Sequence, residues 1–155
     1  MNTKEIITSF YEAFSRADAE GMVKHYSDEI IFEDPAFGIL KGEDAKNMWR
    51  MLLSNATDLK VTFSNVKAEG ESGTADWEAI YTFSKTGRKV HNKIHAAVQC
   101  ENGKIVKHTD EFNFYKWSRM ALGPFGLFFG FTPFVKKKVK TTAKKALKHY
   151  IKHKK

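Results

Sequence analysis

The residues best suited to chemistry lie in the second half of the chain. His95 precedes the turn Asn102-Gly103, and Asp110 follows it. Asn-Gly is the preferred pair for a two-residue type I′ hairpin, and in that register His95 lies directly opposite Asp110. A carboxylate beside an imidazole can hold its tautomer and exchange protons near neutral pH. The pair is therefore a candidate for general acid–base chemistry, with a self-satisfied cross-strand polar pair as the structural alternative.

The same register gives one face of the hairpin an unusual number of ionisable groups. Glu101 then pairs with Lys104 next to the turn. The face carries His91, Lys93, His95, His108 and Asp110, among Phe112 and Phe114. A three-residue loop with a bulge is the alternative, and it would place His95 and Asp110 on opposite faces.

A second carboxylate, Asp34, ends a short apolar run and is followed by Pro35. It can stand at the mouth of a pocket, or it can simply fix the loop that the proline begins. Histidines and acids together could also bind a metal ion, but the chain has no His-x-His or His-Glu-x-x-His spacing. It has no glycine-rich phosphate loop either, so we expect chemistry without a metal or another cofactor.

Helices come first along the chain, and strands follow. Apolar residues at helical spacing, with Thr3 as the candidate N-cap, predict a helix that continues to residue 14, and 18–26 predicts a second, short helix. The run 30–35 indicates a strand stopped by proline, and 41–53 predicts a third helix. Four runs with a period of two follow: 59–69, 73–84, 88–100 and 104–116. Short glycine-containing turns separate them, which predicts antiparallel hairpins and an α+β fold.

Composition limits the class of protein. The chain has 155 residues, of which 42% are apolar and 28% charged, as expected for one globular domain and not for a disordered or fibrous chain. The single cysteine, Cys100, excludes an internal disulfide. We see no signal peptide and no apolar run of about 20 residues, so we expect a cytoplasmic protein.

The charge is distributed unevenly along the chain. Residues 1–118 carry 15 Lys/Arg and 18 Asp/Glu, whereas 119–155 carry 11 Lys/Arg and no acid. The net charge of +8 thus resides in a basic tail, which argues against nucleic-acid binding by the whole domain.

The tail combines aromatic and basic residues. Residues 123–134 contain five phenylalanines, and Thr132-Pro133 offers an N-cap and a first helical residue. Apolar residues from 135 to 151 then form one stripe, with ten lysines between 136 and 155. A basic amphipathic helix behind an aromatic loop is typical of an anchor on an anionic membrane surface. The alternative, which we favour, is a helix that packs its stripe on the body or on a second copy, with the loop as a lid. Nucleic acid ranks third, because no aromatic stacking motif accompanies the lysines.

Several motifs and the order of elements resemble a known superfamily. The stretch Tyr26-Ser-Asp-Glu-Ile-Ile-Phe-Glu-Asp-Pro35 resembles the strand that carries the catalytic base of ketosteroid isomerases. The stretches 90–96 and 103–112, with Trp117 and Gly130-Phe-Thr-Pro133, are similar to a SnoaL-like branch. Nearly the whole chain resembles the nuclear transport factor 2-like superfamily, whose fold is a curved sheet wrapped by three helices into a cone. This superfamily mixes isomerases, cyclases, epoxide hydrolases and non-catalytic binding modules, so the resemblance implies the fold more strongly than the activity.

The resemblance implies a role for each candidate. Asp34 falls where the isomerases keep their proton-shuttling carboxylate, and His95 falls where they keep a protonated aspartic acid and where the polyketide cyclases have a histidine. Asp110 resembles the acid/base aspartate of the cyclases. The oxyanion tyrosine of the isomerases aligns with Phe10, which cannot donate a hydrogen bond, and Tyr11 should point about 100° away around the helix. This departure argues against true steroid isomerase activity.

We therefore expect an α+β cone over 1–118, with three N-terminal helices and a curved antiparallel or mixed sheet, and a basic extension of the same domain over 119–155. The leading function is cofactor-free acid–base catalysis, of isomerase, cyclase or hydrolase type, on a small hydrophobic molecule, with Asp110, His95 and Asp34 as catalytic residues. The expected substrate-binding residues are Tyr11, Phe10, Trp49, His91, His108 and Phe112. The alternative is a non-catalytic module for a lipophilic ligand, with or without attachment to a membrane surface. The resemblance also implies a homodimer through the outer face of the sheet.

Overall fold

A curved six-stranded sheet forms the body of the protein. The computed structural model describes residues 1–154, and in it the strands lie in the order β2-β1-β6-β5-β4-β3. The strands are β1 (Tyr26–Asp34), β2 (Gly38–Lys41), β3 (Lys60–Glu69), β4 (Ser72–Phe83), β5 (Arg88–Glu101) and β6 (Lys104–Glu111). All neighbours are antiparallel except β1 and β6, which run parallel. The sheet is therefore mixed, and the expected α+β cone is confirmed.

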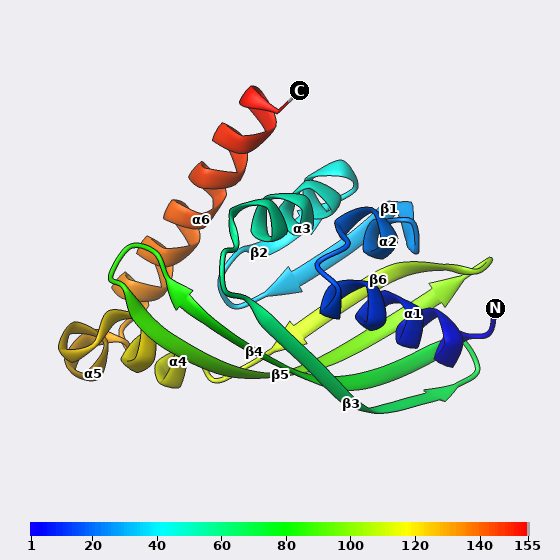
Figure 1. Cartoon of the computed structure of the whole chain (residues 1–155), viewed down its shortest axis with the longest axis horizontal. Helices are drawn as coiled ribbons and strands as arrows, with labels where there is room; N and C mark the ends of the chain where they lie inside the picture. The colour runs from blue at the N-terminus through cyan, green and yellow to red at the C-terminus, as the bar shows by residue number, and fades with distance from the viewer. Residues whose placement is uncertain (155) are drawn as a thin grey trace.

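Three N-terminal helices cover the concave face of this sheet, and three more follow the last strand (Figure 1). The helices are α1 (Thr3–Ser15), α2 (Ala19–Val23), α3 (Glu43–Asn55), α4 (Phe114–Leu122), α5 (Pro124–Phe129) and α6 (Pro133–His153). Helix α1 begins one residue earlier than expected from a Thr3 cap, because Asn2 and Glu5 form a reciprocal capping box. The predicted Thr132 cap of α6 is confirmed, since its side chain accepts a hydrogen bond from the Val135 amide.

Most element predictions are confirmed, and three are wrong. The four alternating runs form β3 to β6, but the last strand ends at Glu111, because Asn113 accepts a hydrogen bond from the Lys116 amide and caps α4. The short strand β2 was not predicted. The phenylalanine-rich segment, expected to be a loop, contains the short helix α5.

The β5–β6 hairpin begins as predicted and then changes register. Asn102 and Gly103 have φ angles of 52° and 78°, as a type I′ turn requires, and Glu101 pairs with Lys104. A bulge then follows between Gln99 and Cys100, where β6 contains one extra residue. Beyond the bulge every pairing is displaced by one residue, which moves a whole set of side chains to the other face.

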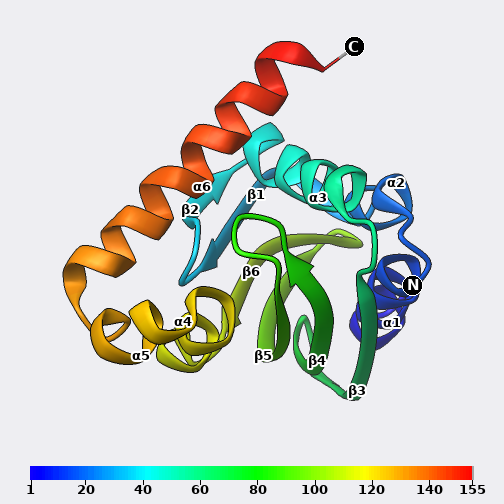
Figure 2. The same ribbon diagram turned by 60° about the vertical axis from the view of Figure 1, so that its left-hand side comes forward.

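Two hydrophobic clusters hold the layers together. The larger lies between the sheet and helices α1 to α3, and Leu147 of α6 belongs to it. The smaller joins β5, α4 and α6 through Val90, Trp117 and Val135. Helix α6 therefore packs its apolar stripe on the body, as favoured from the sequence, and runs along the side of the sheet where β1 and β2 lie (Figure 2). No helix within residues 1–154 is long and apolar enough to cross a bilayer.

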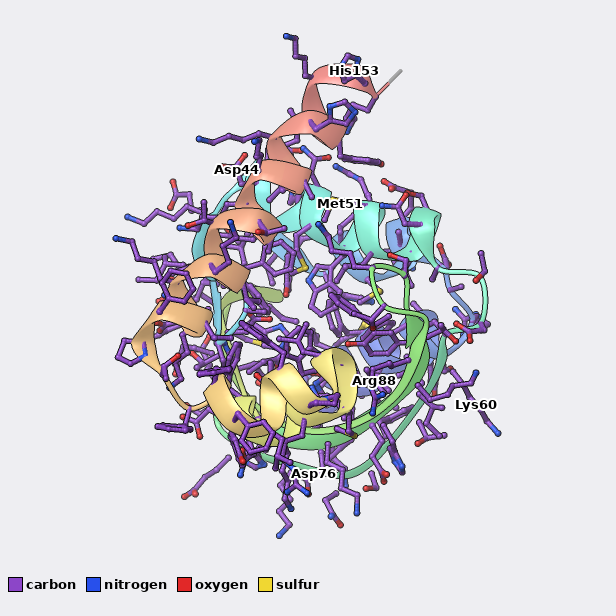
Figure 3. All side chains as sticks on the ribbon, turned by 90° about the vertical axis from the view of Figure 1, so that its left-hand side faces the viewer. Asp44, Met51, Lys60, Asp76, Arg88 and His153 are labelled. Atoms are coloured by element: carbon purple, nitrogen blue, oxygen red, sulfur yellow. The ribbon has the colours of Figure 1, made fainter. Side chains whose placement is uncertain are left out.

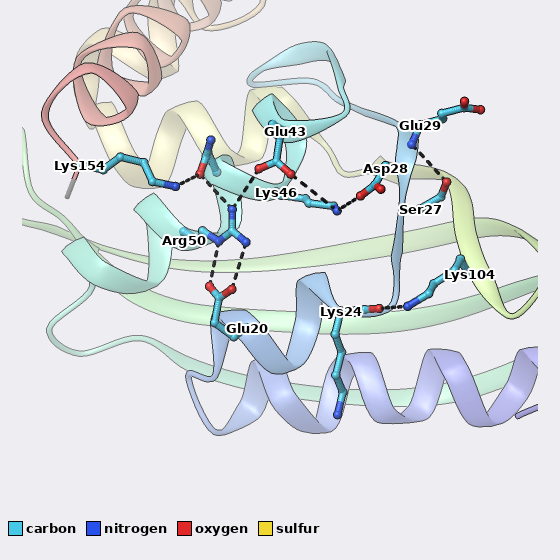
Figure 4. Close-up of polar contacts among 11 residues, drawn as sticks. Glu20, Lys24, Ser27, Asp28, Glu29, Glu43, Lys46, Arg50, Lys104 and Lys154 are labelled. Atoms are coloured by element: carbon cyan, nitrogen blue, oxygen red, sulfur yellow. Dashed lines mark hydrogen bonds and ion pairs between the residues drawn. The ribbon is translucent and has the colours of Figure 1, made fainter.

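Polar contacts fix the helices at the end of the molecule where α6 terminates (Figure 4). Arg50 of α3 bonds both carboxylate oxygens of Glu20 in α2, at 2.8 and 3.0 Å. The Lys154 ammonium donates to the Asn47 side chain at 2.7 Å, and Lys46 donates to Asp28 at the same distance. Polar pairs at or near the surface contribute little stability individually, but together these contacts fix the position of α3 over the cone.

Candidate functional site

The buried imidazole of His108 lies at the centre of a polar network inside the cone. It projects inward from β6 and is fully buried. Its Nε2 lies 2.8 Å from Oδ1 of Asp110, and its Nδ1 lies 2.7 Å from the hydroxyl of Tyr26. The indole N–H of Trp77 donates to the same Asp110 oxygen at 3.4 Å. Three strands, β1, β4 and β6, thus contribute to one buried polar cluster.

The hydrogen bonds assign the tautomer of His108. The Asp110 carboxylate can only accept, so the neutral ring carries its proton on Nε2 and leaves Nδ1 to accept from the Tyr26 hydroxyl, which itself accepts from the indole N–H of Trp49 at 2.9 Å. Nδ1 is therefore an acceptor, and the ring carries its proton on Nε2, which donates to Asp110. The carboxylate and the imidazole are thus held in one orientation by partners on other elements.

Aromatic rings enclose the imidazole on all sides that the network leaves open. Phe10 and Phe32 meet the ring edge to face, with centroids 5.6 and 5.1 Å away, and Trp49 stacks on it at 6.2 Å. All three are almost fully buried. The expected group of Phe10, Trp49 and His108 is therefore brought together, in a setting that strengthens hydrogen bonds by excluding water.

Tyr11 reaches this interior, against the expectation that it would point away. Its hydroxyl lies 3.4 Å from Nε2 of His108, and its side chain is buried beside Phe10. Phe10 and Tyr11 can both face inward because α1 is covered on more than one side, by the sheet and by α2. Burial, with the Asp110 charge as a smaller cause, raises the pKa of Tyr11 well above its usual value, so the phenol is a neutral hydrogen-bonding group.

Asp34 is a second carboxylate that faces the same interior. It ends β1, and its Oδ1 accepts hydrogen bonds from the amides of Ala36 and Phe37 at 3.0 and 2.6 Å. Burial raises the pKa of Asp34 from 3.8 to about 7, with the charge of Asp110 as a further cause, while the two amide bonds oppose the rise. The expected turn role is confirmed by the two amide bonds, and the same side chain changes its charge near neutral pH.

Asp34 is only partly buried, as are Tyr81 of β4 and Phe112, which follows β6. The indole N–H of Trp117 donates to the Tyr81 hydroxyl at 2.9 Å and so links this region to α4. Asp34 contributes to the raised pKa of Tyr81, after burial, which indicates that the two groups face one another.

The predicted pairing of His95 with Asp110 is wrong. The bulge places His95 opposite Glu111, so the His95 side chain lies on the outer face of the sheet, where 55% of it is exposed. Its Nδ1 lies 2.6 Å from Asp76, which Figure 3 shows on the side of the sheet opposite to α3. His91 lies on the same outer face, 2.7 Å from Glu78. Neither histidine is brought together with Asp110.

The sequence analysis missed two members of the network, Tyr26 and Trp77. Both carried a usable signal. Tyr26 has the same parity along β1 as Phe32 and Asp34, and so belongs on the same face. Trp77 alternates in the same way with the buried Ala75 and Ala79 of β4. The partner of Asp110 was sought on the neighbouring strand. It is His108, which lies two residues earlier in the same strand.

A metal site and the single thiol are the remaining candidates for chemistry. No group of three or more His, Cys, Asp or Glu side chains within 1–154 is arranged to hold a metal ion. Cys100 is buried on β5, and burial raises the pKa of its thiol. Asp110, Asp34, Tyr11 and the His108 ring are therefore the groups from which a function can be built.

Comparisons with known proteins agree with this fold. The family profile described as a SnoaL-like domain matches residues 7–108. No curated protein matches the chain. Among solved structures, an NTF2-like protein of unknown function from Burkholderia pseudomallei is 20% identical, with a TM-score of 0.66 over 77% of this chain and 98% of the other.

Two further solved structures bear names that include an activity. An LEH-like epoxide hydrolase from M. tuberculosis is 15% identical, with a TM-score of 0.64 over 78% of this chain and 91% of the other. A candidate polyketide cyclase from Pseudomonas putida is 16% identical, with a TM-score of 0.65 over 78% and 98%. At these identities the likeness is one of fold.

Proposed function

The chain belongs to the SnoaL-like family of the NTF2-like superfamily, and we propose that it catalyses proton transfer, without a cofactor, on a small hydrophobic molecule held inside the cone. The reaction would be of isomerase, cyclase or hydrolase type. Similar structures named as an epoxide hydrolase and a candidate polyketide cyclase make these reaction types reasonable for the fold. The choice among them depends on a substrate that the site alone does not identify.

One observation carries the proposal: a carboxylate with one unengaged oxygen is held inside an aromatic interior by a fixed imidazole. Oδ1 of Asp110 accepts from His108 and from Trp77. Oδ2 accepts no hydrogen bond from any residue within 1–154 and can therefore take a proton. Water-excluding surroundings strengthen such transfers, and a positioned base of this kind contributes about 10²–10⁴-fold to rate.

Asp34 supplies the complementary acid. Near pH 7 it is present in both protonation states, because its pKa is about 7. Its protonated form can donate to an oxygen of the substrate while Asp110 removes a proton from carbon or from water. Two carboxyl groups in different environments thus divide the roles of acid and base, as in other enzymes that use paired carboxyls. The Tyr11 hydroxyl, which stays neutral, is a second donor toward a developing negative charge.

Turnover and binding can be separated with one conservative variant. Asp110→Asn keeps an oxygen that accepts from His108 and Trp77 but cannot take up a proton. We would measure deuterium exchange at the carbon next to the carbonyl of 2-tetralone in heavy water, and opening of styrene oxide in oxygen-18-labelled water. Ligand binding would be followed by native mass spectrometry with the same two compounds.

The proposal predicts that Asp110→Asn loses turnover of the accepted compound and still binds it. Asp76→Asn is the matched control, because it alters the exposed Asp–His pair on the outer face. Binding of either compound without turnover by the wild-type protein would instead support the non-catalytic ligand-binding alternative. Turnover that Asp110→Asn retains would reject Asp110 as the base.

A further inference from the structure

Six large apolar side chains gather in ten residues outside the core. They are Phe125, Leu127, Phe128, Phe129, Phe131 and Phe134, hereafter the aromatic patch, and they are 44% to 71% exposed. The remaining exposed large apolar residues within 1–154 are spread singly over the first half of the chain. Contiguous exposed apolar surface usually marks an interaction site, whereas single exposed residues need no explanation.

A close backbone contact between α5 and α4 leaves the patch facing outward. In α5 the one buried residue is Gly126, whose backbone lies directly against Ser118 of α4. A methyl group at Gly126 would lie 1.9 Å from the Ser118 carbonyl oxygen, so only glycine allows this approach. The Tyr115 hydroxyl donates to the Leu127 carbonyl at 2.7 Å and fixes the helix further. Helix α5 is thus anchored through its backbone and lies at the corner between α4 and α6 (Figure 2), and its large apolar side chains are exposed.

The segment of the chain that carries the patch is uniformly basic. No Asp or Glu occurs from residue 112 to the end of the chain, while Lys116, Arg119 and the lysines of α6 lie in this stretch. Lys137, Lys138 and Lys140 follow the patch within the first two turns of α6 and are exposed. Because the apolar stripe of α6 is already buried against the body, its lysine-bearing face remains directed to solvent.

We propose that the aromatic patch and the adjacent lysines form a docking surface for an anionic lipid membrane. Phenylalanine side chains on a short, backbone-anchored helix can enter the acyl boundary, and lysines beside them meet the headgroups. A second copy of the chain is the less suitable occupant, because a symmetric contact would bring two strongly basic surfaces together. The docking surface is independent of the proton-transfer chemistry assigned to the interior.

The test uses the full chain and vesicles of phosphatidylcholine with and without phosphatidylglycerol, in flotation assays. We expect binding to the anionic vesicles at least tenfold tighter than to the neutral ones, and weaker binding as salt is raised. Phe128→Ser/Phe131→Ser should weaken it at least tenfold, while Ile39→Ser, an exposed apolar residue of β2, should not. Lys137→Gln/Lys138→Gln should weaken it about 25-fold, since each lysine near such a surface contributes about 1 kcal/mol, or fivefold. Lys4→Gln/Lys60→Gln is the matched control.

Three outcomes would overturn the proposal. The first is equal binding to neutral and anionic vesicles, or binding to neither. The second is anionic-vesicle binding that the phenylalanine variant retains in full, which would leave a purely ionic contact. The third is a wild-type oligomer, measured by light scattering, that the phenylalanine variant dissociates while no vesicles bind, which would assign the patch to a second copy. Unchanged thermal melting of each variant confirms that the fold is intact.

Discussion

The buried carboxylate of Asp34 should make the protein less stable as the pH rises toward neutrality. An unfolded chain ionises this group near pH 3.8, whereas in the folded protein its pKa is about 7 because it is buried. Between these values the folded state holds a proton that the unfolded state has released. The stabilising contribution of Asp34 is therefore complete below about pH 3.8 and is lost as the pH rises through about 7.

The magnitude follows from the two pKa values. One pKa unit corresponds to about 1.4 kcal/mol, so the whole difference corresponds to up to about 4 kcal/mol. About 3 kcal/mol of this should be lost between pH 5 and pH 8. Asp34→Asn removes the titration but keeps an oxygen that can accept from the amides of Ala36 and Phe37. When the pH is raised from 5 to 8, the free energy of unfolding of the variant should therefore increase by about 3 kcal/mol relative to that of the wild type.

Urea unfolding of both proteins at pH 5 and pH 8 measures this difference. Glu33→Gln is the matched control, because Glu33 is the neighbouring carboxylate of β1 and faces solvent on the other side of the strand. The difference in unfolding free energy between Glu33→Gln and the wild type should be nearly the same at both pH values. If the free-energy difference between Asp34→Asn and the wild type is also the same at pH 5 and pH 8, Asp34 does not titrate as inferred.

Two further predictions concern packing. His108→Phe fits an aromatic interior but leaves Asp110 and Tyr26 without their buried partner. We therefore expect the free energy of unfolding, measured in urea titrations, to fall by about 3 kcal/mol or more. A fall of less than about 1 kcal/mol would contradict the network. Gly126→Ala forces a methyl group onto the Ser118 carbonyl, so hydrogen exchange of amides in α5 should accelerate by tenfold or more while β5 stays protected. Unchanged exchange in α5 would show that the helix does not depend on that contact.

The fold could be predicted because each of its main elements carries its own signal. The apolar spacing of α1 and α3, the alternation of β3 to β6 and the Asn102-Gly103 turn are local features, and they survive in the structure. The motif from Tyr26 to Pro35 and the family resemblance then indicated that these elements form a cone. The strand β2 was missed because four residues are too few to show a period.

The site could be predicted only in part, because it depends on a bulge. Asp110, Asp34, Tyr11 and His108 lie inside the cone, but His95 does not. A single extra residue in β6 determines which face of the sheet each later side chain of that strand occupies. No residue type in β6 indicates that a bulge is present. One signal was nevertheless available. The even-numbered positions of β5 from Val90 to Cys100 are mostly apolar, which by itself directs His91 and His95 outward.

The measurement that tests the central claim most directly is the effect of two Asp→Asn changes on one rate. Asp110 and Asp76 each lie within 3 Å of a histidine ring nitrogen, one pair inside the cone and one outside. With a compound that the wild-type protein turns over, the rate of deuterium exchange or epoxide opening is compared in the two variants. If the interior pair does the chemistry, Asp110→Asn lowers the rate by at least about 100-fold and Asp76→Asn changes it by less than about twofold. Equal losses in both variants, or none in Asp110→Asn, would contradict the account.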